Sequence, residues 1–428
     1  MARGVKWGRG IFTLGVMEKA TAGLVLSGGG AFGAYEVGVI RALCGGACNA
    51  TAGTSLDAAV FTGTSVGNFN AAILAMNKGG ACGAADLLQD IWLNRIADNG
   101  NGRGNGVYRF RGGFENYFDH RIPGSPVEQL KRLADDITAF GGYAARTAAR
   151  FFTSSERLSH RVADLIDLSV FLDTDPFARL IEEFIEPNTL RASAKWLTVT
   201  ATNWGTGEPR YFDFRDLSDG LVWQAIRASA AIPGLFPPVS IDGEIYIDGG
   251  VVMNTPIKPA IDAGADEIHV ISLDPCVPDL GKDYVPATWD VLNRVVIAMV
   301  AENIAEDIET ARWINEGLEA LEHLANDEAH FETADGKRFI RAARTIRRRL
   351  EKEGQLPRKV TIHRYYPKKP LGGVLGLLNF ARPSIEAMIE HGYIDACEHN
   401  CIANGCVIPK KELRIHSAAA GHLAEGLQ

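Results

Sequence analysis

The sequence predicts an α/β protein in which a mostly parallel central sheet carries helices on both faces. Short buried apolar runs alternate with longer helical stretches along the 428 residues, which is the pattern of parallel strands joined by helices. Two of these runs lead directly into glycine-rich turns, at Gly28 and at Gly63. The balance of 46% hydrophobic and 22% charged residues supplies enough apolar material for a sizeable core.

Each expected element has the length and character that its structure requires. Strands are short apolar runs bounded by turn residues, and helices are longer stretches with apolar residues recurring on one face. The expected strands cover residues 24–27, 58–61, 196–202, 210–214, 245–247 and 268–273. The expected helices cover residues 34–43, 70–76, 221–229, 286–320 and 381–397.

The chain is expected to form one large domain at residues 21–405, between an N-terminal arm (1–20) and a C-terminal tail (406–428). Inside the domain, residues 99–106 alternate glycine with asparagine or arginine, which is typical of a flexible turn. This turn opens a region to about residue 173 that mixes aromatic residues, arginines and helical stretches. We expect that region to be a helical cap or lid.

Composition restricts the partners and the compartment. The net charge of −8 and the pI of about 5.7 give no indication of nucleic-acid binding. Seven scattered cysteines argue against a disulfide framework and favour a reducing, cytoplasmic location. The apolar run 11–17 is too short for a signal-peptide core, and no run approaches the roughly 20 residues of a spanning helix. Any membrane contact is therefore expected to be peripheral, and the oligomeric state stays open.

Ser65 has the sequence context of a nucleophile, in Gly63-Thr64-Ser65-Val66-Gly67. This is the pattern G-x-S-x-G, in which a tight turn between a strand and a helix exposes a serine hydroxyl. The flanking Gly63 and Gly67 form the elbow. A serine in a glycine-rich turn is equally common without any function, so its companions in the sequence decide the interpretation.

The first companion is the glycine cluster Gly28-Gly29-Gly30-Ala31-Phe32-Gly33, between a strand and a helix. Backbone N–H groups of Gly29 and Gly30 at a helix start can stabilise an oxyanion. The spacing of Gly28, Gly30 and Gly33 also matches a dinucleotide fingerprint, which requires an acid ending a second strand about 20 residues on. Residues 44–57 look like a loop, so the oxyanion interpretation is favoured. A simple tight turn is compatible with both.

The second companion is Asp248, which ends the strand 245–247 and precedes Gly249 and Gly250. The glycines turn the chain sharply, so the carboxylate is expected at the same end of the sheet as Ser65. Such a carboxylate can act as the base directly, in a Ser–Asp dyad. The late histidines have no distinctive context, and His269 within a strand is expected to be an ordinary buried imidazole.

These motifs, at residues 27–35, 63–67 and 248–250, resemble the three signatures of patatin-like phospholipases in the family's order. Residues 227–238 and 254–256 resemble the blocks that flank the family's aspartate. The resemblance covers roughly residues 22–273. It implies a patatin-like three-layer fold and a domain that needs neither a metal nor a cofactor.

The resemblance also implies a reaction. Ser65 would attack an ester of a phospholipid or lysophospholipid, Asp248 would take its proton, and water would hydrolyse the acyl-enzyme. Backbone N–H groups of Gly29 and Gly30 would stabilise the oxyanion. The chain departs from many members at Phe32, where they carry Arg or Lys; loss of that cation removes a contact with a lipid phosphate and leaves the head-group preference open.

Three further clusters have both an ordinary and a functional interpretation. The arginine run 341–349 favours a solvated helix face over membrane docking. The cysteines and histidine at 397–406 lack C-x-x-C spacing, which favours structural cysteines over a zinc site. The aromatic residues at 108–118 are expected to pack under the cap rather than to form a lipid entrance.

Two other functions stay open on the sequence. A dinucleotide-binding oxidoreductase would use the loop Gly28–Gly33 for its cofactor. A catalytically silent lipid-binding scaffold would keep the fold without the reaction. The sequence does not fix the acyl position that is cleaved or the preferred head group.

Overall fold

The computed structural model describes residues 21–51, 53–98, 105–110, 172–273, 304–326, 358–369, 371–372 and 376–409, together with positions 338, 341, 344 and 345. The expected arm at 1–20 lies outside these residues. So do nearly all of the expected cap at 99–173 and most of the arginine run and of the C-terminal tail.

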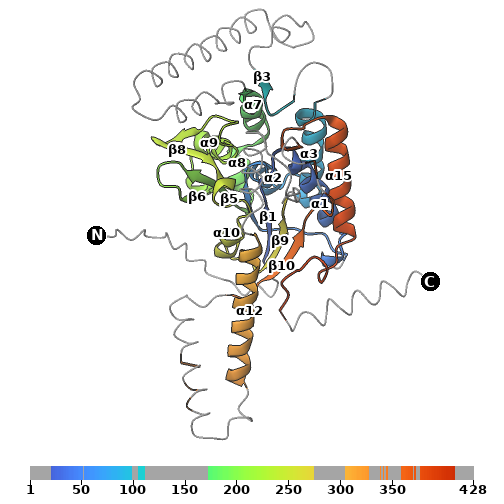
Figure 1. Cartoon of the computed structure of the whole chain (residues 1–428), viewed down its shortest axis with the longest axis vertical. Helices are drawn as coiled ribbons and strands as arrows, with labels where there is room; N and C mark the ends of the chain where they lie inside the picture. Colours follow the sequence, from blue (N-terminus) through green and yellow to red (C-terminus); the bar gives the residue numbers. More distant parts are fainter. Residues whose placement is uncertain are drawn as a thin grey trace, which may run out of the picture.

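A central eight-stranded sheet organises the described part of the chain (Figure 1). Its order is β10 (Thr361–Tyr365), β9 (Glu267–Ile271), β1 (Ala22–Leu26), β2 (Val60–Thr64), β5 (Trp196–Asn203), β8 (Glu244–Asp248) and β7 (Val239–Ile241), and β6 (Pro209–Asp213) also pairs with β5. From β10 to β5 the strands are parallel, whereas β6, β7 and β8 pair antiparallel. The predicted α/β fold with a mostly parallel sheet is confirmed, and it has an antiparallel extension at one side.

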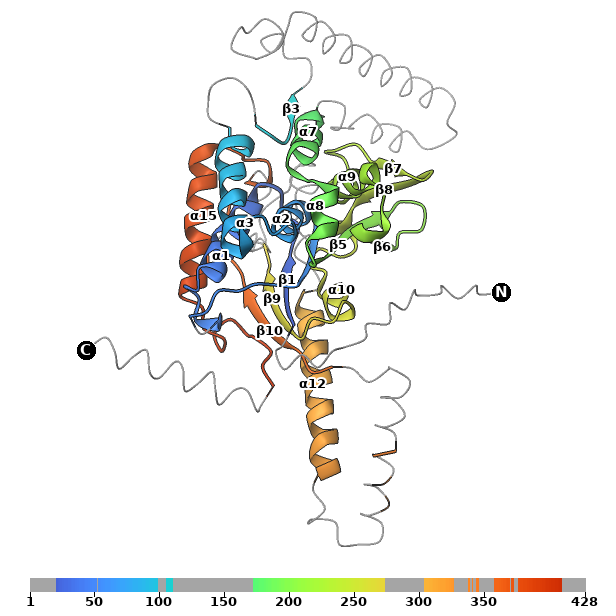
Figure 2. The same ribbon diagram turned by 180° about the vertical axis from the view of Figure 1, so that it is seen from behind.

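Helices cover both faces of the sheet, as predicted. One layer contains α1 (Gly33–Cys44), α2 (Val66–Ala75), α3 (Gly80–Ile91), α7 (Asp175–Phe184), α8 (Pro187–Ala192), α9 (Asp219–Ser229) and α15 (Arg382–Cys397). The other layer contains α10 (Ile257–Asp262) and the start of α12 (Ile304–Asn326), which extends beyond the sheet in Figures 1 and 2. Strand β1 serves both layers because Leu24 and Leu26 join one hydrophobic cluster and Val25 the other.

Several elements differ from the sequence-based expectation. Helix α2 begins at Val66, directly after the candidate nucleophile, rather than near residue 70. Helix α3 was not expected, because its glycines have low helix propensity; burial of Leu88 and Ile91 compensates for them. A short antiparallel pair, β3 (Arg109–Phe110) with β4 (Leu172–Asp173), was also missed. No helix among the described residues is both long and apolar enough to span a bilayer.

Candidate active site

Ser65 occupies a strained turn between β2 and α2. Its backbone has φ 53° and ψ −125°, a conformation that non-glycine residues rarely adopt. The turn is tight on both sides: a Cβ on Gly63 would lie 2.7 Å from the Gly67 carbonyl oxygen, and a Cβ on Gly67 would lie 2.5 Å from the Leu26 oxygen. Both elbow glycines are therefore required by close backbone approach.

A buried serine on a neighbouring helix holds this turn. The Ser229 hydroxyl, at the end of α9, accepts the N–H of Ser65 at 2.8 Å and also accepts a hydrogen bond from the Asn68 amide. The same hydroxyl donates to the Thr200 carbonyl at 2.5 Å. Three segments of the fold thus meet at Ser229, which satisfies an N–H that the strained elbow would otherwise leave unpaired.

Strand register brings Asp248 to the serine. Thr64, the last residue of β2, pairs with Thr200, and Asp248, the last residue of β8, pairs with the next residue, Ala201. Strand β6 occupies one edge of β5 at both of these positions. Strands β2 and β8 therefore both lie on the other edge of β5, where their ends meet. The residue after Asp248 must be glycine, since a Cβ on Gly249 would clash with the Thr200 carbonyl.

Burial alters the protonation of the Asp248 carboxyl. It is 5% exposed, and burial raises its pKa from 3.8 to about 7; the Gly250 N–H and then the Ser65 hydroxyl act in the lowering direction. Oδ1 accepts the Gly250 N–H at 2.7 Å, while Oδ2 is buried without a partner among the described residues. The Ser65 hydroxyl thus lies close enough to lower the pKa of Asp248 but does not complete a hydrogen bond to Oδ2.

The glycine loop presents two N–H groups beside the serine. Gly28 is anchored by Asn254, whose Oδ1 and backbone oxygen accept the Gly28 N–H at 3.1 and 3.3 Å. In the described part of the chain, the N–H groups of Gly29 and Gly30 have no acceptor; they lie where a 3-10 turn begins and leads into α1. Gly30 has φ +55° and borders the same cavity as Ser65. Two free donors at a helix start can bind a developing anion.

An apolar cavity of about 40 Å³ opens beside Ser65. Its wall is built almost entirely of aliphatic and aromatic side chains, among them Val66, Phe69, Trp92, Ile96, Val107, Phe177, Ile232, Phe236, Leu377 and Phe380. Tyr108 packs behind this wall against Phe236 and Phe380, and its hydroxyl donates to the Leu378 oxygen at 2.9 Å. The space beside Ser65 is therefore small and apolar, so it favours hydrocarbon over charged groups.

Phe32 faces the core. Its side chain is fully buried, and a Cβ added to Gly376 would lie 2.8 Å from Phe32 Cε1. The ring therefore packs against Gly376 in the interior and is not exposed to solvent.

Among the described residues, β2 does not end in the acid that a dinucleotide site needs. Strand β2 ends in Thr64 and continues into Ser65, where the fingerprint requires an acidic residue. Asp57 lies before β2 and pairs with Lys195 at 2.5 Å. His269 is fully buried in β9, where burial lowers its pKa to about 4, and Nδ1 lies 3.0 Å from the Tyr365 hydroxyl. It is the neutral core histidine that the sequence indicated.

Ser229 and Asn254 were not identified as functional from the sequence. Both lie inside the blocks that flank the aspartate motif, 227–238 and 254–256, and that position was the only available signal. Their roles depend on contacts across the fold rather than on local spacing.

Comparison with known proteins assigns the chain to a family. The patatin-like phospholipase family model matches residues 24–261, which is more than half of the chain. The chain belongs to the patatin-like phospholipase family. The matched range contains the glycine loop, the Ser65 elbow and Asp248.

Curated relatives of this patatin-like chain are much longer proteins. Lysophospholipase NTE1 of Cryptococcus neoformans is 30% identical over 159 residues, which cover 32% of this chain and 10% of the relative. Lysophospholipase nte1 of Aspergillus fumigatus is 28% identical over 277 residues, covering 64% of this chain and 13% of the relative. The patatin-like chain thus matches about a tenth of the length of these relatives.

Among solved structures, VipD from Legionella pneumophila matches 93% of this chain and 71% of its own, with 17% identity and a TM-score of 0.35.

Proposed function

We propose that this patatin-like protein is a lipid acyl hydrolase that cleaves carboxylic esters of phospholipids or lysophospholipids with a Ser65–Asp248 dyad. The observation that carries the proposal is the end-to-end meeting of β2 and β8, which sets a strained serine beside a buried carboxylate. Family membership and the names of the lysophospholipase relatives support the same chemistry.

The first half of the reaction forms an acyl-enzyme. Ser65 Oγ attacks the ester carbonyl carbon while its proton passes to Asp248 Oδ2, and the new oxyanion binds the N–H groups of Gly29 and Gly30. Collapse of the tetrahedral intermediate breaks the carbon–oxygen bond of the ester. The leaving alcohol takes the proton back from Asp248.

The second half releases the fatty acid. Water gives a proton to Asp248 and attacks the acyl carbonyl, and collapse of this second intermediate expels Ser65 Oγ. The proton returns from Asp248 to the serine, so the dyad is regenerated. Neither half needs a histidine. Because the pKa of Asp248 is raised to about 7, this one carboxyl can both take and return a proton near neutral pH.

The cavity favours recognition of a single acyl chain. Its wall is apolar, and among the described residues no lysine, arginine or histidine lines it, so this part of the site binds hydrocarbon rather than a head group. A lysophospholipid, with one chain, requires less rearrangement of this small cavity than a diacyl lipid. We propose that the protein takes such substrates from a lipid surface by peripheral contact.

A turnover assay tests the proposal. Fatty-acid release is measured from lysophosphatidylcholine and from diacyl phosphatidylcholine vesicles with the wild-type chain, Ser65→Ala and the matched control Ser55→Ala, an exposed serine. We expect release by the wild type and the control, faster from the lysolipid, and none by Ser65→Ala. Lipid binding without release would support the silent scaffold instead, and saturable NAD binding without release would support the oxidoreductase.

A further inference from the structure

A cluster of two histidines and two cysteines lies at the edge of the sheet, away from the Ser65 elbow. His363 belongs to the edge strand β10, and His399, Cys401 and Cys406 belong to the loop that follows α15. One nitrogen or sulfur atom from each of the four lies within 4.8 Å of all the others. The histidines are buried and the cysteines half-buried.

The distances within the cluster match those around a tetrahedral metal ion. Cys401 Sγ lies 3.6 Å from His363 Nδ1 and 3.5 Å from His399 Nε2, and Cys406 Sγ lies 3.5 Å from His399 Nε2. Zinc bonds of about 2.3 Å to sulfur and about 2.0–2.1 Å to nitrogen, at a tetrahedral angle, separate the two ligand atoms by about 3.6 Å. We propose that His363, His399, Cys401 and Cys406 bind one zinc ion.

The loop that carries the two cysteines is shaped by its own hydrogen bonds. Asn400 Oδ1 accepts the N–H groups of Ile402 and Ala403, both at 3.0 Å. The Cys406 N–H then returns to the Cys401 carbonyl at 2.9 Å, which closes the turn between the two ligands. This local closure replaces the short C-x-x-C turn whose absence from the sequence argued against zinc.

The far end of the loop is fixed to the strand that supplies His363. Val407 and Ile362 exchange both backbone hydrogen bonds, at 2.8 and 2.9 Å, in an antiparallel bridge. Cys406 and His363 are the adjacent residues in the two segments, so this bridge holds two ligands from distant parts of the sequence side by side.

Neighbouring groups orient the ligands, as is usual around bound metals. The Arg364 N–H donates to Cys406 Sγ at 3.3 Å, and the His363 ring stacks on His269 with centroids 4.9 Å apart. Glu267 and His269 each also have a possible metal-ligand atom within 4.8 Å of one on His363. His399 Nδ1, in contrast, is buried without a protein partner among the described residues.

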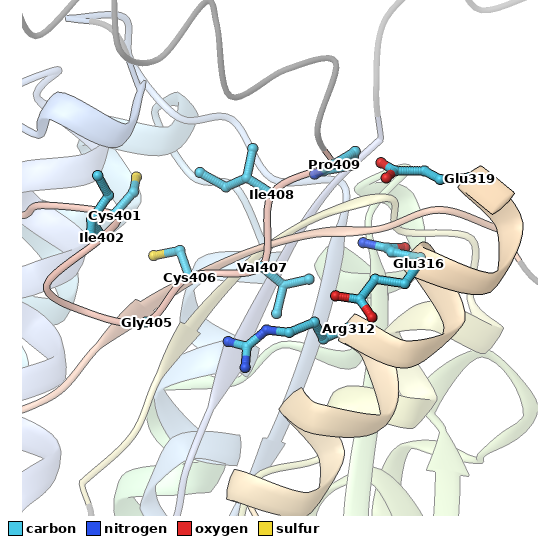
Figure 3. Close-up of a pocket in the computed structure, with 11 residues that line it drawn as sticks. Arg312, Glu316, Glu319, Cys401, Ile402, Gly405, Cys406, Val407, Ile408 and Pro409 are labelled. Carbon is cyan, nitrogen blue, oxygen red and sulfur yellow. The ribbon is translucent and has the colours of Figure 1, made fainter. Parts of the chain in front are cut away.

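A cavity of about 340 Å³ gives a path to the cluster. Figure 3 shows the Cys401 and Cys406 sulfur atoms toward one end of it and Arg312, Glu316 and Glu319 of α12 toward the other. An ion can therefore reach the two sulfur atoms without unfolding of the sheet edge.

The site is structural, because four protein ligands leave no open position for a substrate. Binding releases the two thiol protons to solvent and joins the loop after α15 to β10. Helix α15 packs along α1, which begins directly after the glycine loop. The ion thus stabilises the layer behind the active site and takes no part in ester cleavage.

Metal analysis of the whole chain, purified without a metal-binding tag, tests the site. Mass spectrometry of the intact native protein and elemental analysis are expected to give one zinc ion per chain. The double variant Cys401→Ser/Cys406→Ser is expected to lose it, and the matched control Cys397→Ser is expected to keep it. Replacement of the zinc by Co²⁺ should give the visible absorption bands of tetrahedral cobalt with thiolate ligands.

The wild-type protein alone can overturn the proposal, even if the variants fail to fold. Zinc-free wild-type protein that takes up no ZnCl₂ and keeps its melting temperature in chelator contradicts the site. A Cys401–Cys406 disulfide in protein prepared with zinc present contradicts it as well. Zinc retained by the double variant would place the ion elsewhere and would also overturn the assignment.

Discussion

The Ser229 hydroxyl accepts the main-chain N–H of Ser65 at 2.8 Å and donates to the Thr200 carbonyl at 2.5 Å. One buried side chain therefore connects the elbow to β5, the strand with which Asp248 pairs. The elbow is strained, with φ 53° at Ser65, and this connection helps to maintain it. The geometry of the candidate dyad depends on a residue outside it.

Ser229→Ala is expected to slow catalysis through loss of this connection. The Ser65 N–H and the Asn68 amide lose a buried acceptor, which should lower the free energy of unfolding by about 1–3 kcal/mol. Displacement of the nucleophile should reduce kcat by about 10- to 100-fold with little change in KM. The control is Ser218→Ala, an exposed serine at the start of the same helix. A Ser229→Ala enzyme with wild-type kcat would show that the elbow holds itself.

The pH dependence of kcat/KM should report the Asp248 carboxyl. Only the carboxylate can accept the serine proton, and burial raises its pKa to about 7. Activity should therefore be constant above about pH 8 and fall about tenfold per unit below about pH 6. Initial rates with a soluble ester measure the profile. An activity that persists down to the ordinary aspartate pKa of about 3.9 would contradict this assignment.

Asp248→Asn should separate activity from stability. The amide cannot take the proton, so kcat/KM should fall by about 10²- to 10⁴-fold. The native pKa lies above the unfolded one, so the wild-type carboxyl destabilises the fold progressively as pH rises from about 4 to about 7. Thermal unfolding should accordingly show a higher Tm for the variant at about pH 8 and little difference near about pH 4. The opposite pH trend would mean that the carboxylate is stabilised in the fold.

Gly249→Ala should damage the junction of the two strand ends. The added methyl group would clash with the Thr200 carbonyl and lie 3.0 Å from Thr64 Cγ2, between β2 and β8. We expect a loss of about 1–3 kcal/mol of stability and most of the activity. At the control Gly220→Ala, an exposed helical site with nothing within 4 Å of the new Cβ, stability should rise by about 0.4–1 kcal/mol. Equal behaviour of the two variants would contradict the packing described for Gly249.

The sequence predicted the features that depend on local chemistry. The strand before Gly28, the elbow at Ser65 and the strand that ends at Asp248 each carry their signal within a few residues, and the structure contains all three turns. Alternating apolar runs and helices were likewise sufficient for the α/β fold class. The roles of these residues in catalysis remain predictions.

The features that the sequence did not reveal depend on register and packing. Ser229 forms a hydrogen bond to β5, and Asn254 accepts the Gly28 N–H although it lies 226 residues further along the chain. The meeting of Thr64 and Asp248 depends on which residues of β5 they pair with. His363 approaches Cys401 only because β10 joins the sheet edge, so spacing alone disfavoured the metal site that we propose.

The most direct test of the dyad is covalent capture of the nucleophile by a fluorophosphonate. The account predicts one label per wild-type chain, located on the Ser65 peptide by mass spectrometry, with no label on Ser65→Ala and slower labelling of Asp248→Asn. The control Ser55→Ala should label like the wild type. Labelling of Ser65→Ala at the wild-type rate, or a folded wild-type chain that is never labelled, would contradict it.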